Sequence, residues 1–293
     1  SSGFRHFVPH SVPFIKGDLK NPQDIHKAFK SFKIDRVMHF ASSIIVPESV
    51  SDPIKYYENN VLSFINLVKA MQVAGVNQII FSSTAAVYAE PKKVPIPEDA
   101  QLLPNNPYGQ TKLICEQILR DAAAAQRDFS YVIFRYFNVA GAFEKGGIGE
   151  SHEPETHLIP IVLETALGQR KFLQVFGDDY PTADGTCVRD YIHVDDLCEA
   201  HYLALQDIAK KARNQIFNLG SQKGFSVKEV IDVVKKVTGK DFSVRIFPRR
   251  PGDGPKLIAD SSKAKRILGW VTQRGLEKMI SSAWKWEKFV AGK

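Results

Sequence analysis

The hydrophobic pattern along the chain consists of short, nearly unbroken apolar runs separated by longer amphipathic stretches. The clearest apolar runs are residues 36–41, 78–81 and 131–137, and each is followed by small polar residues. A strand buried on both faces of a parallel sheet has this continuous apolar character rather than strict alternation. The pattern therefore predicts parallel strands at these positions.

The stretches between the apolar runs carry helix start signals. Helices are predicted to begin near residues 22, 53 and 107, each with a proline in its first turn and an Asn or Asp before it. The second of these helices is expected to end at Gly75. Strands that alternate with helices predict an α/β fold, a Rossmann-like doubly wound parallel sheet with ligands at the carboxyl ends of its strands.

The texture of the sequence changes after residue 138. Residues 139–185 are rich in glycine and proline, with one helical run at about 158–168. A further strand is predicted at 215–219 and a helix at about 226–237. We therefore expect a second, smaller lobe, with at least one return of the chain to the first.

Composition and charge narrow the class of protein. The 293 residues are 44% hydrophobic and 24% charged, an ordinary globular composition that excludes a largely disordered chain. The 39 basic and 32 acidic residues give a net charge of +7, but the basic residues are spread along the chain and no nucleic-acid-binding motif is present. We expect this charge to serve phosphates of small molecules and not nucleic acid.

Membrane and metal signals are equally weak in the sequence. No run approaches the roughly 18 apolar residues of a membrane span, and no signal peptide opens the chain. Cys115, Cys187 and Cys198 are scattered without the spacing of metal ligands, which suits a reducing compartment. These features predict a cytoplasmic protein with no membrane partner and no metal site.

The strongest chemical signal is a tyrosine and a lysine four residues apart at the start of a predicted helix. Tyr108 and Lys112 lie one turn apart on one face. Lowering a tyrosine pKa from about 10 to near 7 takes roughly 4 kcal/mol. An ammonium about 4 Å away supplies about that much at an effective dielectric constant of about 20. The pair is a candidate base for a hydroxyl proton, with Thr84 as a relay, although a surface tyrosine beside a solvated lysine has the same spacing.

At this point the sequence resembles a known family. F-S-S-T-A-A-V-Y at 81–88 and N-P-Y-G-Q-T-K at 106–112 resemble the extended short-chain dehydrogenase/reductase superfamily. R-Y-F-N-V-A-G-A at 135–142, the block at 176–197 and R-R-P-G-D at 249–253 are similar to the UDP-glucose 4-epimerases within it. The resemblance runs from about residue 17 to about residue 270.

The resemblance implies an isomerase of galactose metabolism that interconverts UDP-glucose and UDP-galactose with NAD. Tyr108 would take the proton of the sugar 4-hydroxyl while NAD accepts hydride from carbon 4. The 4-keto sugar would then turn over in the site and receive the hydride on its other face. Lys112 would lower the tyrosine pKa and hold the nicotinamide ribose, and Thr84 would bind the sugar hydroxyl.

The resemblance also implies the remaining binding residues and the lobes. The cofactor set is Asp18, Leu19, Phe40, Ala41, Ser42, Asn59, Ser82, Tyr108, Lys112 and Tyr136. The UDP-sugar set is Thr84, Tyr108, Asn138, His157, Leu158, Phe176, Arg189, Arg250 and Asp253. Residues 1–138 with 186–222 would form the dinucleotide-binding domain, and 139–185 with 223–293 the nucleotide-sugar-binding lobe.

Several positions bear on which reaction of the superfamily applies. Related dehydratases place an Asp-Glu pair after the matching threonine, whereas this chain has Ala85 and Ala86, which favours epimerisation. Leu257 lies where some members have a tyrosine that excludes N-acetylated sugars, so a UDP-N-acetylglucosamine 4-epimerase remains an alternative. The diphosphate loop often begins Asn-Asn-Leu in the family, but here it reads Thr-His-Leu at 156–158.

Two further expectations concern the ends and the assembly of the chain. The glycine-rich dinucleotide turn is absent from the sequence, so we expect the chain to begin inside the fold, without the first strand, helix and second strand. An epimerase with that segment missing from the sequence, and a non-catalytic sugar-nucleotide-binding relative, both fit this absence. A homodimer is expected through the helices at about 53–74 and 107–125, whose apolar stripes could equally pack against the sheet.

Overall fold

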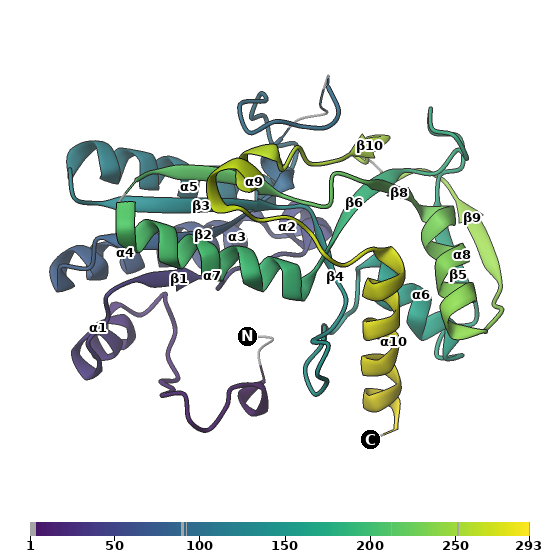
Figure 1. Cartoon of the computed structure of the whole chain (residues 1–293), viewed down its shortest axis with the longest axis horizontal. Helices are drawn as coiled ribbons and strands as arrows, with labels where there is room; N and C mark the ends of the chain where they lie inside the picture. The colour runs from purple at the N-terminus through teal and green to yellow at the C-terminus, as the bar shows by residue number, and fades with distance from the viewer. Residues whose placement is uncertain (1–3, 89–90, 92, 212, 251, 293) are drawn as a thin grey trace.

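The larger part of the molecule is built around a parallel sheet. The computed structural model describes residues 4–88, 91, 93–211, 213–250 and 252–292. Strands β1 (Val37–His39), β2 (Gln78–Thr84), β3 (Ser130–Tyr136) and β7 (Gln215–Leu219) lie in the order β1-β2-β3-β7, all parallel (Figure 1). The predicted α/β fold with a Rossmann-like parallel sheet is confirmed, and β1 to β3 lie in the three apolar runs of the sequence.

Helices bury both faces of this sheet. One face packs against α1 (Pro22–Ser31), α4 (Ser63–Ala74) and α5 (Pro107–Ala125) through a cluster that contains Ile79 and Phe81. The other face packs against α7 (Val194–Lys211) and α9 (Ser262–Leu268) through a cluster that contains Ile80. Successive residues of β2 therefore enter opposite cores, which explains why its sequence is apolar without alternation.

The helical segment before β2 differs from its prediction. Instead of one helix from residue 53, the structure has α2 (Val46–Ser51), α3 (Pro53–Tyr56), a π-helical turn η2 (Tyr57–Leu62) and then α4. Asp52 caps α3, and Gly75 ends α4 with a φ of 69°, as expected. In the π turn Asn60 is buried and bonded to polar groups of two other segments, a contact that no apolar period reveals.

The smaller part of the molecule lies beside the carboxyl ends of this sheet. Among the described residues it contains two small sheets and three helices. Strands β10 (Lys256–Leu257), β6 (Val188–His193) and β4 (Asn138–Ala140) are parallel neighbours, and β8 (Gly224–Ser226) pairs antiparallel with β6. Strands β5 (Leu173–Phe176) and β9 (Val244–Phe247) form a parallel pair. Two short 3₁₀ turns, η1 (Arg5–Phe7) and η3 (Ala85–Val87), complete the elements.

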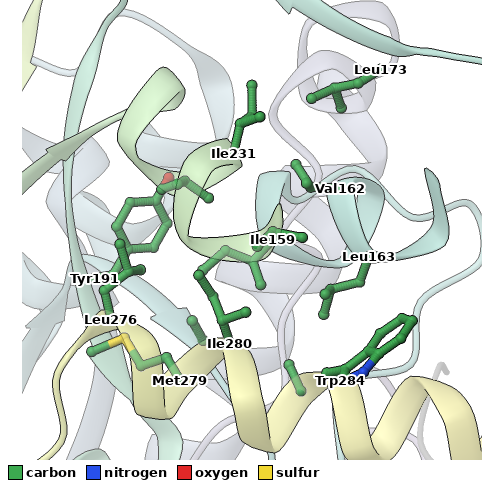
Figure 2. Close-up of a cluster of buried hydrophobic side chains, with 14 of the residues drawn as sticks. Ile159, Val162, Leu163, Leu173, Tyr191, Ile231, Leu276, Met279, Ile280 and Trp284 are labelled. Carbon is green, nitrogen blue, oxygen red and sulfur yellow. The ribbon is translucent and has the colours of Figure 1, made fainter. Parts of the chain in front are cut away.

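Helices α6 (Leu158–Ala166), α8 (Val227–Thr238) and α10 (Leu276–Ala291) enclose a separate apolar cluster. Figure 2 shows Ile159 and Leu163 on the side of α6 toward Ile280 and Trp284 of α10, and Val162 on the side toward Ile231 and Leu173. The start of α8 is fixed by a capping box, in which Ser226 and Glu229 satisfy each other's backbone N–H groups. This cluster gives the second part of the chain a core of its own.

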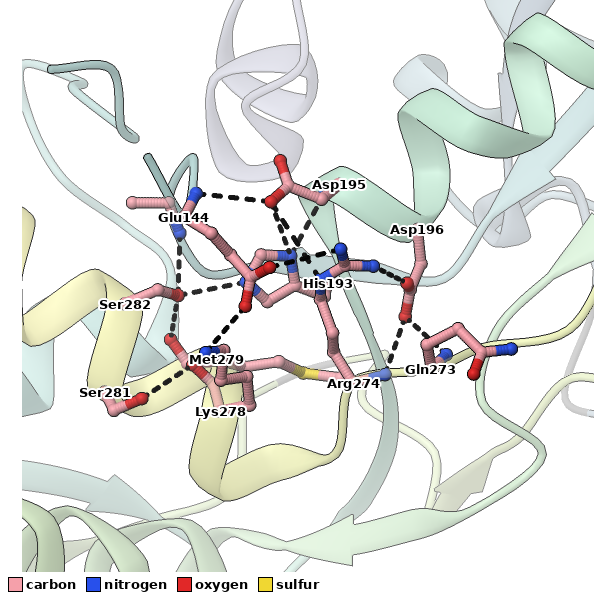
Figure 3. A network of polar contacts seen from close by, with 11 residues as sticks. Glu144, His193, Asp195, Asp196, Gln273, Arg274, Lys278, Met279, Ser281 and Ser282 are labelled. Atoms are coloured by element: carbon pink, nitrogen blue, oxygen red, sulfur yellow. Dashed lines mark hydrogen bonds and ion pairs between the residues drawn. The ribbon is translucent and has the colours of Figure 1, made fainter. Parts of the chain in front are cut away.

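A polar network ties the start of α7 to α10 and to the loop after β4 (Figure 3). Arg274 is ion-paired with Asp196 and, at 3.2 Å, with Glu144, while Lys278 lies 2.7 Å from Glu144. The backbone N–H groups of Gln273 and Arg274 donate to the buried Asp196 carboxylate at 3.0 Å each. These contacts fix the start of α10 against the start of α7 and the loop after β4. No helix in the described ranges is long and apolar enough to span a membrane.

Candidate active site

The chemically active groups meet at the carboxyl ends of β2 and β3. Thr84 is the last residue of β2 and lies in register with Tyr136, the last residue of β3. The Thr84 hydroxyl oxygen accepts from the N–H of Ala86 at 3.1 Å. Burial raises the pKa of Tyr108 and hydrogen bonding with the Thr84 side chain lowers it, so the candidate hydroxyl relay lies beside the candidate tyrosine.

The first turn of α5 is held unusually close to this strand end. The Asn106 side chain caps α5 by accepting from the N–H of Gly109 at 2.9 Å. A Cβ atom on Gly109 would lie 2.3 Å from the carbonyl oxygen of Ala86, so only glycine allows this approach. Because Tyr108 precedes this glycine, the close packing sets its distance from Thr84.

Lys112 is buried beneath the tyrosine. Its side chain is 3% exposed, and Nζ donates to the carbonyl oxygen of Ser82 at 2.8 Å and lies 5.1 Å from the centre of the Phe81 ring. Burial lowers the pKa of Lys112 to about 8, so the ammonium form still dominates at pH 7. An ammonium has three donors, and among the described residues this one donates only to the carbonyl oxygen of Ser82. Two donors are left for hydroxyl groups of a ligand.

The electrostatics of Tyr108 differ from the simple tyrosine–lysine expectation. Burial raises the pKa of Tyr108, and the hydrogen bond from Thr84 opposes that rise. The Lys112 ammonium is hydrogen-bonded to the β2 backbone at Ser82 and not to the phenol. The lowering of the tyrosine pKa by Lys112 therefore stays a prediction.

A buried ion pair supports the site from below. Glu116, one turn after Lys112 on α5, accepts from Arg135 of β3 at 2.7 and 2.9 Å and from the Ser83 hydroxyl of β2 at 2.6 Å. Glu116 and Arg135 are both fully buried. These contacts lock α5 to both strands that carry the site. These contacts of Glu116 were not predicted from the sequence, although Arg135 inside the apolar run at 131–137 was a visible signal.

Some of the residues implied for the cofactor gather at the same edge. Tyr136 Oη lies 2.6 Å from His201 Nε2 and is also hydrogen-bonded to Ser82. Phe40, at the end of β1, is 55% exposed, and its ring centre lies 5.0 Å from that of His201. Ala41 is exposed beside it. These side chains leave an apolar and partly polar surface open to a ligand.

The loop after β1 is held by the π turn. Ser42 donates to the carbonyl oxygen of Ser43 at 3.1 Å, and Asn59 donates to the Ser43 hydroxyl at 2.9 Å. Asn60 accepts from the Ser43 N–H at 2.8 Å and donates to the Thr111 hydroxyl of α5 at 3.0 Å. Asn60 therefore links the loop after β1 to α5, a connection that the sequence pattern did not predict.

Asp18 and Leu19 lie away from this group. The Asp18 N–H donates to the Asp24 carboxylate at 2.9 Å, and the Leu19 carbonyl oxygen accepts from Asn66 of α4 at 3.2 Å. Leu19 packs against the core cluster under α1 and α4. Among the described contacts none joins these two residues to Tyr108 or Lys112, so their proposed role is at the far end of an extended ligand.

The residues implied for the nucleotide sugar form two close pairs. The Arg250 guanidinium lies 4.0 Å from the centre of the Phe176 ring. Arg189 Nη2 lies 3.2 Å from the Asp253 carboxylate, and its Nη1 donates to the carbonyl oxygen of Gly254 at 3.0 Å. Each pair joins a strand of the second part of the chain to the loop at 249–254.

The segment that carries Arg250 and Asp253 also contacts the chain directly before α5. Asn105, directly before the cap of α5, donates through Nδ2 to the carbonyl oxygen of Gly252 at 3.2 Å. The arginine-bearing loop therefore lies beside the entry of the helix that carries Tyr108. Guanidinium groups here suit a diphosphate, because each offers a planar fork of donors.

The other implied sugar residues are placed differently. Asn138 is exposed on β4 and its side chain is hydrogen-bonded to Tyr191. Leu158 is the first residue of α6 and packs partly into the core. His157 precedes Leu158, and its Nδ1 lies 2.9 Å from the Glu155 carboxylate and 3.0 Å from the Glu150 carboxylate. One ring nitrogen of His157 is thus already engaged within its own loop.

Comparison with known proteins agrees with this architecture. The profile of the NAD dependent epimerase/dehydratase family matches residues 1–220. The chain is 51% identical over 278 residues to a UDP-glucose 4-epimerase of Halalkalibacterium halodurans, covering 94% of this chain and 83% of that protein.

Solved structures are similarly close. The crystal structure of a UDP-glucose 4-epimerase from Bifidobacterium longum in complex with NAD+ and UDP is 43% identical with a TM-score of 0.89, covering 93% of this chain and 82% of that one. The UDP-Glc/GlcNAc 4-epimerase of Campylobacter jejuni is 46% identical with a TM-score of 0.83, covering 96% and 85%. With a Tyr-Lys-Thr group at the strand ends and relatives of this identity along nearly its whole length, the chain belongs to the UDP-glucose 4-epimerases of the NAD-dependent epimerase/dehydratase family.

Proposed function

We propose that the protein catalyses the NAD-dependent interconversion of UDP-glucose and UDP-galactose. The observation that carries the proposal is the buried Lys112, one helical turn after Tyr108, held with Thr84 at the carboxyl edge of a parallel sheet. Ligands of such sheets bind at this edge. The relatives reported above bear the name of this activity over nearly the whole chain.

The buried ammonium is the feature that fits a dinucleotide best. Lys112 has two donors free for the hydroxyl groups of the nicotinamide ribose, and the exposed Phe40 offers a flat apolar surface nearby. Bound NAD would supply the hydride acceptor and donor at sugar carbon 4. The residues that would hold it are Asp18, Leu19, Phe40, Ala41, Ser42, Asn59, Ser82, Lys112 and Tyr136.

Tyr108 is the proposed base for the sugar 4-hydroxyl. In the forward step the hydroxyl proton moves to the phenolate oxygen of Tyr108, and in the return step it moves back to the sugar oxygen. Thr84 donates to the same phenol and so orients it. Because burial raises the tyrosine pKa, the positive charge of Lys112 and of the bound cofactor is needed nearby to favour the phenolate.

The nucleotide part of the substrate is assigned to residues from both proposed domains, around β4, β5, β6 and the segment that carries Arg250 and Asp253. Arg189 and Arg250 are proposed to bind the diphosphate, with the other contacts from Asn138, His157, Leu158, Phe176 and Asp253. Ala85 and Ala86 follow Thr84 in η3, where neither side chain can remove a proton or protonate a leaving group. This supports epimerisation over elimination of water.

The proposal extends to organisation and assembly. Residues 1–138 with 186–222 would bind the dinucleotide and 139–185 with 223–293 the sugar nucleotide, in the cytoplasm, where its unpaired cysteines are stable. Phe64 and Ile118 pack into the sheet core, but Ile54, Leu62 and Val73 remain 65%, 48% and 74% exposed on the segment expected at a homodimer interface. Light scattering that gives twice the chain mass would support the dimer, and a monomer mass would contradict it.

A direct assay tests the activity. The purified protein, supplied with NAD, is incubated with UDP-galactose, and the sugar signals are followed by proton NMR. We expect UDP-glucose to form until the two sugars reach equilibrium, with no net reduction of NAD. A chain that binds UDP-galactose without converting it would instead support the non-catalytic alternative.

One position favours a second substrate class. Leu257 of β10 lies in register with Arg189 of β6, so its side chain is adjacent to the proposed diphosphate site and is smaller than the tyrosine of some relatives. UDP-N-acetylglucosamine is therefore expected to react, and a Leu257→Tyr variant is expected to lose that activity by at least about tenfold while UDP-galactose conversion changes little. Equal loss with both substrates, or no reaction of the wild-type protein with the N-acetylated sugar, would exclude this role.

A further inference from the structure

The loop between β4 and α6 carries two histidines and two glutamates at close spacing. Glu150, His152, Glu155 and His157 each offer one ligand atom, and these atoms all lie within 4.8 Å of one another. The four residues read E-x-H-x-x-E-x-H in the sequence, a signal that the prediction of no metal site overlooked. Of these four side chains, only His157 has a role in the proposed epimerase reaction, as a contact of the UDP-sugar.

The separations match the edges of a metal coordination polyhedron. His157 Nδ1 lies 3.0 Å from Glu150 Oε1 and 2.9 Å from Glu155 Oε1, and His152 Nδ1 lies 3.3 Å from Glu150 Oε1 and 3.3 Å from the other oxygen of Glu155, Oε2. A tetrahedral zinc ion with bonds of about 2.1 Å separates its ligand atoms by about 3.4 Å. Small movements of these side chains would therefore place all of them on one ion.

The carboxylates of the cluster have no other cation beside them in the described contacts. Glu150 and Glu155 have only the two histidines as ion-pair partners, whereas nearby Glu164 is paired with Arg170. A divalent ion could therefore take the place of two histidine protons without breaking a further ion pair.

The surrounding structure holds the ligands before any ion binds. The backbone N–H groups of Thr156 and His157 donate to the Glu155 carboxylate at 2.7 and 2.8 Å. The Trp286 indole N–H donates to the carbonyl oxygen of Glu150 at 2.7 Å. A Cβ atom on Gly149 would lie 2.2 Å from the Trp286 ring, so the ring packs directly against the backbone of Gly149. Hydrogen bonds to the residues that carry metal ligands orient those ligands and raise metal affinity.

We propose that Glu150, His152, Glu155 and His157 bind one divalent metal ion, zinc by preference, that fixes the loop ahead of α6. Two imidazole nitrogens and two carboxylate oxygens are ligands that zinc accepts in four-coordinate sites. All four ligands come from the protein, so the ion would be structural and distinct from the proposed catalytic group. The competing state is two imidazolium–carboxylate pairs without metal.

Metal uptake by the tag-free full-length protein tests the proposal. After dialysis against a chelator, the protein is titrated with zinc sulfate at pH 7.5 in competition with a chromophoric chelator. We expect one zinc per chain, with an affinity that falls as the pH is lowered because zinc needs the neutral form of both histidines.

Variants separate this site from chance surface binding. His152→Ala and, as a near-isosteric change, Glu155→Gln are expected to weaken zinc binding by at least about 100-fold, because each removes a ligand. His26→Ala, which removes an exposed histidine on α1, is the matched control and should bind zinc as the wild type does. Circular dichroism checks that each variant is folded.

The outcomes distinguish the alternatives. Uptake of less than about 0.2 zinc per chain at micromolar free zinc, or equal loss in the His26→Ala control, would overturn the proposal in favour of plain ion pairs or adventitious binding. Neither His152 nor Glu155 belongs to the proposed substrate set. Failure of the zinc site would therefore leave the epimerase proposal untouched.

Discussion

A Tyr108→Phe variant is expected to convert UDP-galactose about 10²–10⁴-fold more slowly than the wild-type protein, because it lacks the proposed proton acceptor. The phenol is hydrogen-bonded to Thr84 and held in place by the close approach of Gly109 to Ala86. Phenylalanine fills the same volume, so folding and ligand binding should be retained. The rate is measured with UDP-galactose at saturating NAD.

The matched control is Tyr202→Phe, which removes the hydroxyl of a tyrosine on α7 that is 59% exposed. This variant should keep the wild-type rate. Retention of more than about a tenth of the activity by Tyr108→Phe, with NAD still bound, would show that another group takes the proton. Loss of NAD binding in that variant would instead assign the tyrosine to holding the cofactor.

A Glu116→Ala variant is expected to lose about 3–5 kcal/mol of the free energy of unfolding, because it leaves the buried Arg135 guanidinium without a counter-charge. The two groups are fully buried and joined by two hydrogen bonds at 2.7 and 2.9 Å. Ser83 would lose its acceptor as well. The measurement is guanidinium-induced unfolding followed by circular dichroism.

Two further variants show whether the buried charge is the cause. Arg120 also pairs with Glu116, but it is partly exposed, so Arg120→Ala should cost less than about 1 kcal/mol. A Glu116→Leu/Arg135→Met double variant removes both charges together and should be more stable than either single change. A double variant as unstable as the sum of the two would show that the ion pair has no such role.

The sheet was predictable from sequence because its strands are buried on both faces. The runs that became β1, β2 and β3 stand out as continuous apolar segments, and Gly75 marks the end of α4 by its left-handed φ of 69°. The π turn at Tyr57–Leu62 was not predictable. It depends on side-chain bonds of Asn60 to residues distant in sequence, which a local pattern does not contain.

The site was predictable to a similar extent. Residues four apart on a helix must share a face, which identified Tyr108 and Lys112 as neighbours. The sequence could not show where the lysine ammonium points, and the structure directs it to the Ser82 carbonyl oxygen instead of the phenol. It also could not reveal that Glu116 and Arg135 face each other, since they belong to different elements.

The burial of Lys112 also has a consequence for stability. Its pKa of about 8 in the folded protein lies below the ordinary lysine value of 10.5, so the folded state binds fewer protons than the unfolded state between these two pH values. Stability from this group therefore rises with pH through that window, and at neutral pH the full cost of about 3 kcal/mol is present. The protein retains a destabilising charge where a ligand is meant to bind. A ligand that offers acceptors to this ammonium should accordingly raise the melting temperature more than an analogue of equal size without them.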